Sequence, residues 1–200
     1  MKELSQQYQK KKAEIKSRLN DFANLHKDDY FYELCFCILT PQSSAKRADS
    51  CIKELKNLDF KNKNINPFQI LHKKIRFHNH KSAYLVKAKE NYKKIERAIE
   101  NIKDSKELRE FLVKNIKGYG YKESSHFLRN IGYKNLAILD RHILKNLNKL
   151  KIIHEIPKSL NKDNYLKIEK QFQEFAEKIN IPMDELDLLF WSLETGEIFR

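Results

Sequence analysis

The chain has 200 residues, enough for one large domain or two small lobes around a hydrophobic core. It carries 40 Lys and Arg against 27 Asp and Glu, and this formal charge of +13 favours a polyanionic partner, either nucleic acid or an anionic membrane surface. The first residues lack the apolar segment of an export signal, and the uncharged run at residues 34–45 is too short to span a bilayer. We therefore expect a cytoplasmic protein without a membrane span.

Helical spacing of apolar residues recurs along the whole chain, while four Gly and four Pro leave little turn chemistry for a sheet. We expect an all-α fold. In chain order, the expected helices carry their apolar positions at residues 4–22, 31–39, 45–55, 84–99, 108–112, 124–131, 143–147, 168–179 and 186–193.

Boundary signals accompany several of these helices. Asp28 and Asp29 precede the second helix as possible N-caps. Asp104 and Glu107 resemble a capping box at the start of the fifth helix. The segment 62–67, NKNINP, is the nearest thing to a linker.

Three cysteines lie inside the helical patterns. Their odd number and helical positions predict reduced core thiols rather than disulfides for Cys35, Cys37 and Cys51. They cannot supply a four-cysteine iron–sulfur site. The histidines have no accompanying ligand spacing, so we expect no metal.

The most informative stretch is residues 115–131, NIKGYGYKESSHFLRNI, which indicates a tight glycine hairpin that opens a helix. Glycine permits positive φ and close approach of another backbone, and the N–H groups at a helix start attract anions. Lys117, Gly118, Tyr119 and Gly120 are therefore the expected contacts to a DNA phosphate. An ordinary helix corner with glycine for packing is the alternative.

Lys122 lies in the first turn after the hairpin, and Asp140 begins the next helix. A lysine amine is a nucleophile only when it is deprotonated, a form that burial or the positive end of a helix favours. Asp140 is a natural N-cap, and its carboxylate could also stabilise positive charge on a sugar that loses its base. A solvated lysine and a plain cap are the structural alternatives.

The segments KGYGYKESSHFLRNIG and LAILDRHIL resemble the helix-hairpin-helix DNA glycosylase superfamily. The chain looks closest to the type 2 8-oxoguanine DNA N-glycosylase/AP lyases, because DELDLLFWSLETGEIFR resembles their C-terminal signature. ILTPQSSAKRADSCIKEL and RFHNHKSAYL resemble two further segments of that family. The resemblance implies a cofactor-independent, nucleoid-associated, monomeric enzyme. It would flip 8-oxoguanine out of double-stranded DNA, excise it and cleave the strand by β-elimination.

The same resemblance assigns roles to individual residues. Lys122 matches the lysine that attacks C1′ of the damaged nucleotide and forms a Schiff base, and Asp140 matches the essential aspartate. Gln42 matches the residue that fills the gap left by the extruded base.

A second set of residues matches the pocket for the damaged base. Phe77 and Trp191 correspond to aromatic residues that line it, and Asp187 lies one turn before Trp191 on the same helical face. The terminal carboxylate, carried here by Arg200 where the family commonly has lysine, would reach into the pocket.

The implied fold has two lobes. Residues 27–132 would form a helical barrel that ends in the helix-hairpin-helix, while residues 1–26 and 133–200 would form the second lobe, with Lys122 and Asp140 facing each other across the cleft. Two alternatives remain. One is an endonuclease III-like glycosylase for oxidised pyrimidines, which the missing iron–sulfur cysteines disfavour. The other is a non-enzymatic helix-hairpin-helix DNA-binding module.

Overall fold

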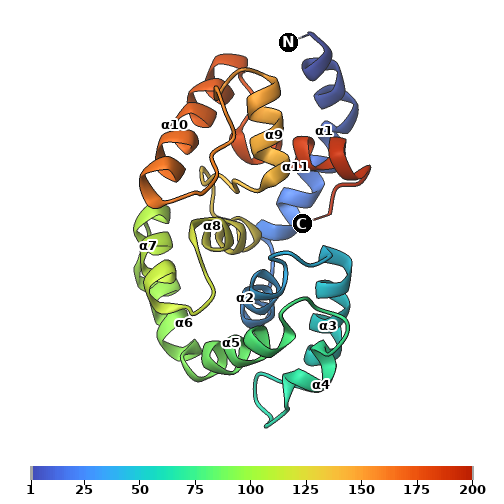
Figure 1. Cartoon of the computed structure of the whole chain (residues 1–200), viewed down its shortest axis with the longest axis vertical. Coiled ribbons are helices and arrows are strands. Elements are labelled where there is room, and N and C mark those ends of the chain that lie inside the picture. The colour runs from blue at the N-terminus through green and yellow to red at the C-terminus, as the bar shows by residue number, and fades with distance from the viewer. Residues whose placement is uncertain (1, 200) are drawn as a thin grey trace. The chain divides into compact units, whose positions relative to one another are not determined.

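The structure is a computed structural model and describes residues 2–199 (Figure 1). Within this range the chain is helical throughout and contains no β-strand, which confirms the all-α prediction. The chain divides into two compact units, one formed by Leu25–Phe127 and the other by the residues up to Asn24 together with those from Leu128 onward. None of the helices in the described part has the length and apolar character that a bilayer crossing requires.

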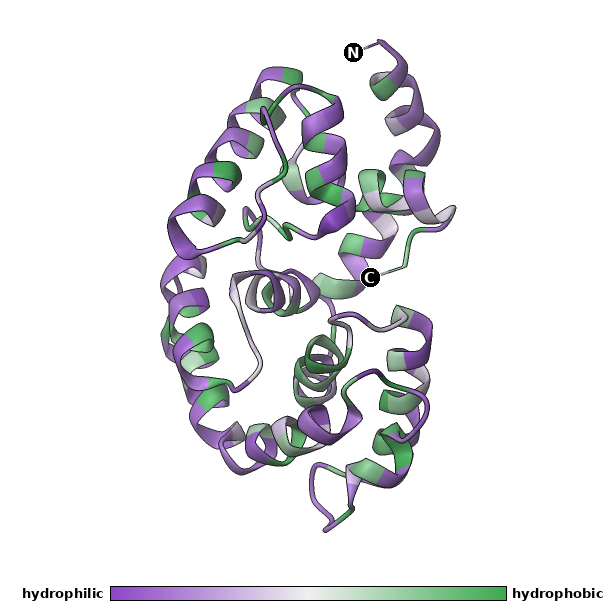
Figure 2. Cartoon of the chain, viewed as in Figure 1, coloured by the Kyte–Doolittle hydropathy of each residue, from purple (hydrophilic) through white to green (hydrophobic). Residues whose placement is uncertain are grey.

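The unit formed by Leu25–Phe127 is organised around helix α2. Its sequence, YFYELCFCIL, is apolar on almost every side, and a helix of that kind is stable in water only when it is surrounded. Helices α3 and α5 pack against it, and Figure 2 shows α2 in the hydrophobic colour. The elements of this unit are η1 (Lys27–Asp29), α2 (Tyr30–Leu39), α3 (Ala45–Asn57), α4 (Pro67–Leu71), α5 (His78–Glu90), α6 (Tyr92–Asn101), α7 (Ser105–Asn115) and the first part of α8 (Tyr121–Asn130).

The cysteines lie in this core. The structure has Cys35 and Cys37 on α2 and Cys51 on α3 buried and outside any disulfide, as predicted for reduced core thiols. Burial raises the pKa of the Cys35 and Cys51 thiols, because a thiolate would lose its hydration there. These thiols therefore act as small apolar side chains.

The expected single helix over residues 84–99 is wrong. The chain breaks at Asn91, between α5 and α6, and the Asn91 side-chain amide donates to the carbonyl of Lys87 at 2.9 Å. Asparagine competes with the helix for backbone groups in this way, so a continuous apolar pattern does not guarantee a continuous helix. The sequence did not indicate helix α4. In the structure Asn66 caps this helix by accepting from the N–H of Phe68 at 3.1 Å.

The helix starts also differ in detail. Asp29 occupies the N-cap position of α2 but makes no side-chain capping bond, because its carboxylate pairs with Lys56 of α3. At α7 the prediction is confirmed for the aspartate, since Asp104 accepts from the N–H of Glu107 at 2.8 Å. The ion pair with Lys56 thus prevents Asp29 from capping α2, whereas Asp104 forms its predicted cap.

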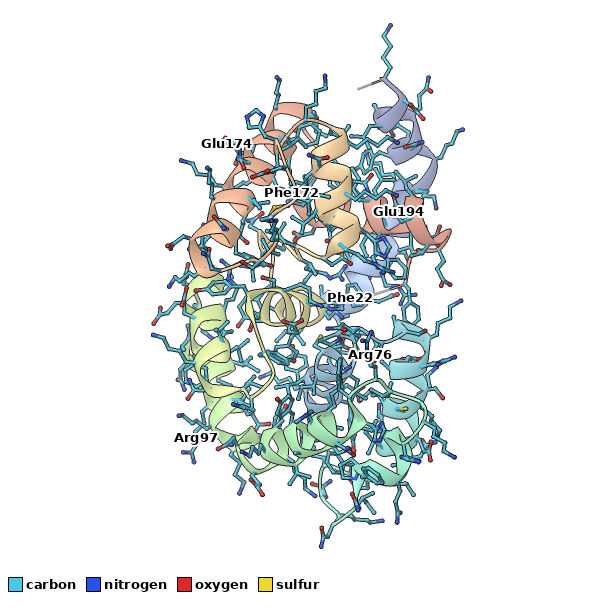
Figure 3. All side chains as sticks on the ribbon, in the orientation of Figure 1. Phe22, Arg76, Arg97, Phe172, Glu174 and Glu194 are labelled. Carbon is cyan, nitrogen blue, oxygen red and sulfur yellow. The ribbon has the colours of Figure 1, made fainter. Side chains whose placement is uncertain are left out.

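The second unit is organised around α11. Helices α1, α9 and α10 all contact it, and Phe172 of α10 stacks on Phe190 of α11 with ring centroids 5.9 Å apart. The buried hydroxyl of Tyr8 donates to Glu185 and joins α1 to α11. Charged residues such as Glu174 point outward from their helices (Figure 3). The elements of this unit are α1 (Lys2–Ala23), the end of α8, α9 (Arg141–Lys149), α10 (Lys162–Ile179) and α11 (Met183–Thr195).

Candidate active site

The glycine hairpin connects α7 to α8 by a turn that only glycine accommodates. Gly118 has φ +87°, and a Cβ added there would lie 2.5 Å from Cδ2 of the Tyr84 ring. The N–H of Tyr119 donates to the carbonyl of Ile116 at 3.3 Å and closes the turn. The predicted hairpin is therefore present, and its tightness depends on the missing side chain of Gly118.

Tyr119 anchors this hairpin to the core. Its ring is buried, and its hydroxyl donates to the carbonyl of Leu34 on α2 at 2.8 Å. Of the four residues predicted to contact DNA, Tyr119 therefore uses both its hydroxyl and its N–H within the protein. Lys117 and Gly118 are exposed and Gly120 is half-buried, so their backbone groups stay near the surface.

A hollow of about 600 Å³ lies beside the hairpin. Lys87 of α5, Lys114 of α7 and Lys117 line it, together with Gly118. Three lysines around one hollow favour an anion such as a phosphate. The structure thus adds Lys87 and Lys114 to the residues that the sequence singled out.

Lys122 lies in the first turn of α8, as predicted, and its nearest recorded partner is Glu123. The Lys122 Nζ is 3.0 Å from Oε1 of Glu123, and the Lys122 side chain retains 25% of its exposure. The second carboxylate oxygen, Oε2, accepts from the N–H of Gly120 at 3.0 Å. Glu123 therefore joins the hairpin backbone to the lysine.

The sequence alone did not single out Glu123. The available signal was an acidic residue in the first turn of a helix, a position where it stabilises the exposed N–H groups. That signal predicts a cap, and only the structure reveals that the same carboxylate also holds Lys122.

Gln42 lies at the tip of the turn between α2 and α3. The N–H of Ser43 donates to the carbonyl of Thr40 at 3.0 Å, and Gln42 has φ +54°. Left-handed backbone costs a non-glycine residue roughly 1–3 kcal/mol, so the surroundings must hold this turn. The Gln42 side chain is exposed, as a residue that enters DNA requires.

Phe77 also has left-handed backbone. It stands at the N-cap position of α5 with φ +57°, and the residue is 48% exposed. The guanidinium of Arg76 lies over the ring at 5.0 Å from the centroid, and Figure 3 labels this arginine. An exposed aromatic ring with a cation on one face is suited to stacking against a base on the other.

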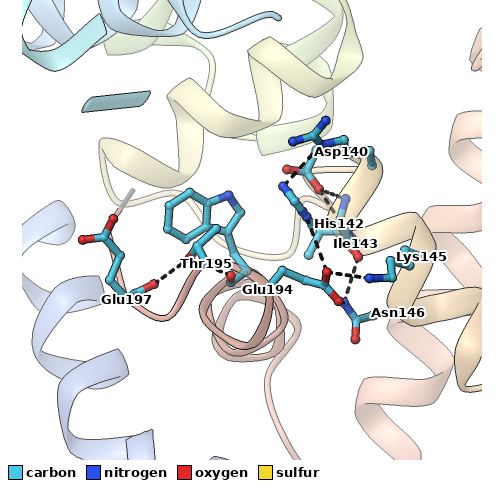
Figure 4. Close-up of polar contacts among 10 residues, drawn as sticks. Asp140, His142, Ile143, Lys145, Asn146, Glu194, Thr195 and Glu197 are labelled. Carbon is cyan, nitrogen blue, oxygen red and sulfur yellow. Dashed lines mark hydrogen bonds and ion pairs between the residues drawn. The ribbon is translucent and has the colours of Figure 1, made fainter. Parts of the chain in front are cut away.

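Asp140 caps α9 as predicted (Figure 4). Its Oδ1 accepts from the N–H groups of His142 at 2.8 Å and Ile143 at 2.9 Å, which fixes the orientation of the carboxylate. The same figure shows Glu194 of α11 accepting from Lys145 at 2.7 Å. This ion pair ties α9, and with it Asp140, to α11.

Asp187 of α11 lies near Asp140 in the same unit. Burial raises the pKa of Asp187 to about 7, the Arg129 guanidinium 3.6 Å away opposes that rise, and the charges of Asp140 and Asp184 add to it. Trp191 lies one turn farther along α11 and is half-buried. The structure therefore brings Asp187 and Asp140 within electrostatic reach, a relation that the sequence did not indicate.

Arg200, predicted to complete the base pocket, lies outside the described residues. Among residues 2–199, His, Cys, Asp and Glu form no group of three or more that could hold a metal ion.

Residues 15–181 match the family model described as 8-oxoguanine DNA glycosylase. The chain belongs to the 8-oxoguanine DNA glycosylase family. It is 44% identical to the 8-oxoguanine DNA glycosylase/AP lyase of Fusobacterium nucleatum, over 99% of this chain and 96% of that protein. The enzyme of the same name from Methanocaldococcus jannaschii is 40% identical, over 90% and 86% of the two chains.

Solved structures of 8-oxoguanine DNA glycosylases share this fold. The M. jannaschii glycosylase/lyase in complex with a 15mer DNA containing 8-oxoguanine has a TM-score of 0.90 and 37% identity, with all of both chains covered. The Thermotoga maritima enzyme has a TM-score of 0.87 and 31% identity, covering 100% of this chain and 97% of that one. Family membership confirms the resemblance and argues against both alternatives, the endonuclease III-like enzyme and the non-enzymatic module.

In this 8-oxoguanine DNA glycosylase family member, Gly118→Ala should destabilise the protein more than Gly196→Ala. Both glycines have positive φ, +87° and +86°, so each alanine meets a similar backbone cost of about 1–2 kcal/mol. Only the Cβ at residue 118 also meets the Tyr84 ring, whereas the described residues leave open space at residue 196. Urea denaturation measures both free energies of unfolding, and equal losses would contradict the close approach.

The buried Asp187 should make the protein less stable as the pH rises. Its folded-state pKa of about 7 lies above the ordinary aspartate value of 3.8, so the folded state binds the proton more tightly. The resulting stabilisation is full below about pH 4 and is lost as the pH rises through 7. Asp187→Asn mimics the protonated acid, and its melting temperature should fall less than that of the wild type between pH 5 and pH 8. Parallel curves would show that Asp187 does not titrate in this range.

Proposed function

We propose that this chain is a bifunctional DNA glycosylase and AP lyase that removes 8-oxoguanine from double-stranded DNA through a Schiff base on Lys122. The observation that carries the proposal is the position of Lys122. In a chain of this family, the lysine follows the Gly118 hairpin directly and keeps part of its side chain exposed. The names of the relatives and the 8-oxoguanine-containing DNA held by a solved neighbour support the same substrate.

DNA binding would rest on the phosphate backbone. The surrounding lysines, Lys87, Lys114 and Lys117, would hold a phosphate beside the hairpin, since the N–H groups of Tyr119 and Gly120 already have acceptors within the protein. The net charge of +13 adds attraction that depends on salt and not on sequence. This contact would place the backbone of the damaged strand near Lys122.

Access to the lesion requires base flipping, which costs roughly a few kcal/mol of stacking and pairing. Gln42 would enter the space that the base vacates, and the exposed ring of Phe77 would stack against a base. Trp191 and Asp187 of α11 are assigned to recognition of the extruded base. These contacts would recover part of the stacking and pairing that flipping breaks.

The chemistry would begin with the loss of a proton from the Lys122 ammonium, for which the Glu123 carboxylate is an acceptor at 3.0 Å. The free amine bonds to C1′, and the glycosidic bond breaks with its electron pair leaving on the base, which takes up a proton. Opening of the sugar ring gives the Schiff base. Loss of a C2′ proton then expels the 3′ phosphate and cleaves the strand.

Asp140 would stabilise the positive charge that develops on the sugar as the base departs. Both capping bonds of Asp140 go to Oδ1, and we assign Oδ2 to the substrate. Lysine and aspartate come from one chain, so we propose a monomer as the working form, acting on chromosomal DNA.

The assignment of Lys122 predicts that Lys122→Gln loses the covalent intermediate. Borohydride reduction should trap wild-type protein on 8-oxoguanine DNA, and the variant should lose at least about a thousandfold in trapping rate because an amide cannot form a Schiff base. DNA affinity should remain close to that of the wild type. Lys53→Gln, at an exposed position on α3, is the matched control and should trap normally. Undiminished trapping by Lys122→Gln would overturn the assignment.

A second variant separates the two roles of Asp140. Asparagine is as good an N-cap as aspartate, so Asp140→Asn should leave the melting temperature nearly unchanged. Because the charge is lost, single-turnover excision of 8-oxoguanine should fall by roughly 10²–10³-fold. If excision stays normal in this variant, Asp140 is only a cap.

A further inference from the structure

Lys81 is a buried lysine with three partners in one small region. It lies on α5 and is 5% exposed. Its Nζ donates to the carbonyls of Leu39 at 2.7 Å and Pro41 at 2.6 Å, and to the hydroxyl oxygen of Ser43 at 3.1 Å. An ammonium has three N–H donors, so these acceptors satisfy it completely.

Two of these acceptors define the turn that carries Gln42. Leu39 is the last residue of α2, and its carbonyl points away from the helix without a partner inside it. Pro41 lies two residues later in the turn, immediately before Gln42. A cation at a helix C-terminus is favoured electrostatically, so Lys81 stabilises both the helix end and the turn.

The third acceptor connects this turn to the Phe77 segment. The Ser43 hydroxyl oxygen also accepts from the N–H of Arg76 at 3.2 Å. Ser43 follows Gln42 and Arg76 precedes Phe77, so this hydrogen bond joins the neighbours of two residues with left-handed backbone. Lys81 and Ser43 together link the two exposed side chains that the proposed function assigns to the DNA.

We propose that Lys81 is a positioning residue for base extrusion, whose ammonium holds the Gln42 turn and the Arg76–Phe77 segment in the geometry that the duplex requires. This inference rests on the proposed function, because the roles of Gln42 and Phe77 come from it. Lys81 does not touch the reacting atoms. It acts through the two segments that it fixes.

The surroundings of Lys81 give it a pH dependence. The pKa of Lys81 is lowered to about 8, mainly by burial and also by the charge of Lys122, while Glu123 opposes the shift. Above that pH, the neutral amine has two N–H donors for three acceptors. One contact is then lost, together with the attraction between the cation and the end of α2.

Two substrates separate positioning from chemistry. One is a duplex with a single 8-oxoguanine, and the other is the same duplex with a preformed abasic site, which has no base to extrude. Lys81→Met should lower single-turnover excision of 8-oxoguanine by about a hundredfold, in line with the cost of small misplacements. Cleavage at the abasic site should change by less than about threefold, because Lys122 is untouched.

Two further variants keep the test decisive. Ser43→Ala removes the shared acceptor at a half-buried position, and it should lower excision by about tenfold with abasic cleavage spared. Lys81→Arg keeps the charge and the donors and should recover most of the excision. Lys53→Met on α3 removes one exposed positive charge and should behave like the wild type.

The pH profile gives a readout that loss of folding cannot imitate. The excision rate of the wild type, divided by that of Lys81→Arg, should fall above about pH 8, because arginine stays charged there and Lys81 does not. Any effect of pH on the chemistry at Lys122 is common to both proteins and cancels in this ratio. If Lys81→Met unfolds, Ser43→Ala and this ratio decide the question. Equal losses on both substrates in Ser43→Ala, or a ratio that stays constant with pH, would overturn the inference. Wild-type protein without 8-oxoguanine excision would instead refute the proposed function.

Discussion

The hydrogen bond from the Tyr119 hydroxyl to the carbonyl of Leu34 is the contact on which the candidate catalytic unit depends. It ties a surface hairpin to α2, the most deeply buried helix of its unit, where few alternative positions are open to it. The left-handed backbone of Gly118 lets the chain turn directly over the Tyr84 ring, and α8 starts immediately afterwards. Lys122 therefore occupies a defined position because the residues before it are held by the core.

Two charged side chains then connect this hairpin and the nearby turns. Glu123 accepts from the N–H of Gly120 and holds the ammonium of Lys122, and buried Lys81 holds the turn that carries Gln42. The charge of Lys122 lowers the pKa of Lys81 and that of Glu123 raises it, so the three groups form one electrostatic system. A change of charge at Lys122 or Glu123 should therefore alter the protonation of Lys81, even though each of the three groups also has a structural role.

In the other unit, two nearby carboxylates have different surroundings. Asp140 is oriented by the N–H groups of His142 and Ile143. Asp187 is buried beside Arg129, and loss of hydration raises its pKa to about 7. A polar, oriented carboxylate close to one that holds a proton near neutral pH is a common way to separate two functions among similar side chains.

The all-α class, the glycine hairpin, the cap at Asp140 and the family could be predicted from the sequence, because each depends on local spacing or on a short motif. Tertiary structure decided the break at Asn91, the pairing of Asp29 with Lys56, and the roles of Lys81 and Glu123. Lys81 is one of 40 basic residues, and nothing in its immediate neighbours distinguishes it from a solvated surface charge. Its acceptors lie about 40 residues away in the chain, and the burial that shifts its pKa exists only after α2 and α5 have packed together.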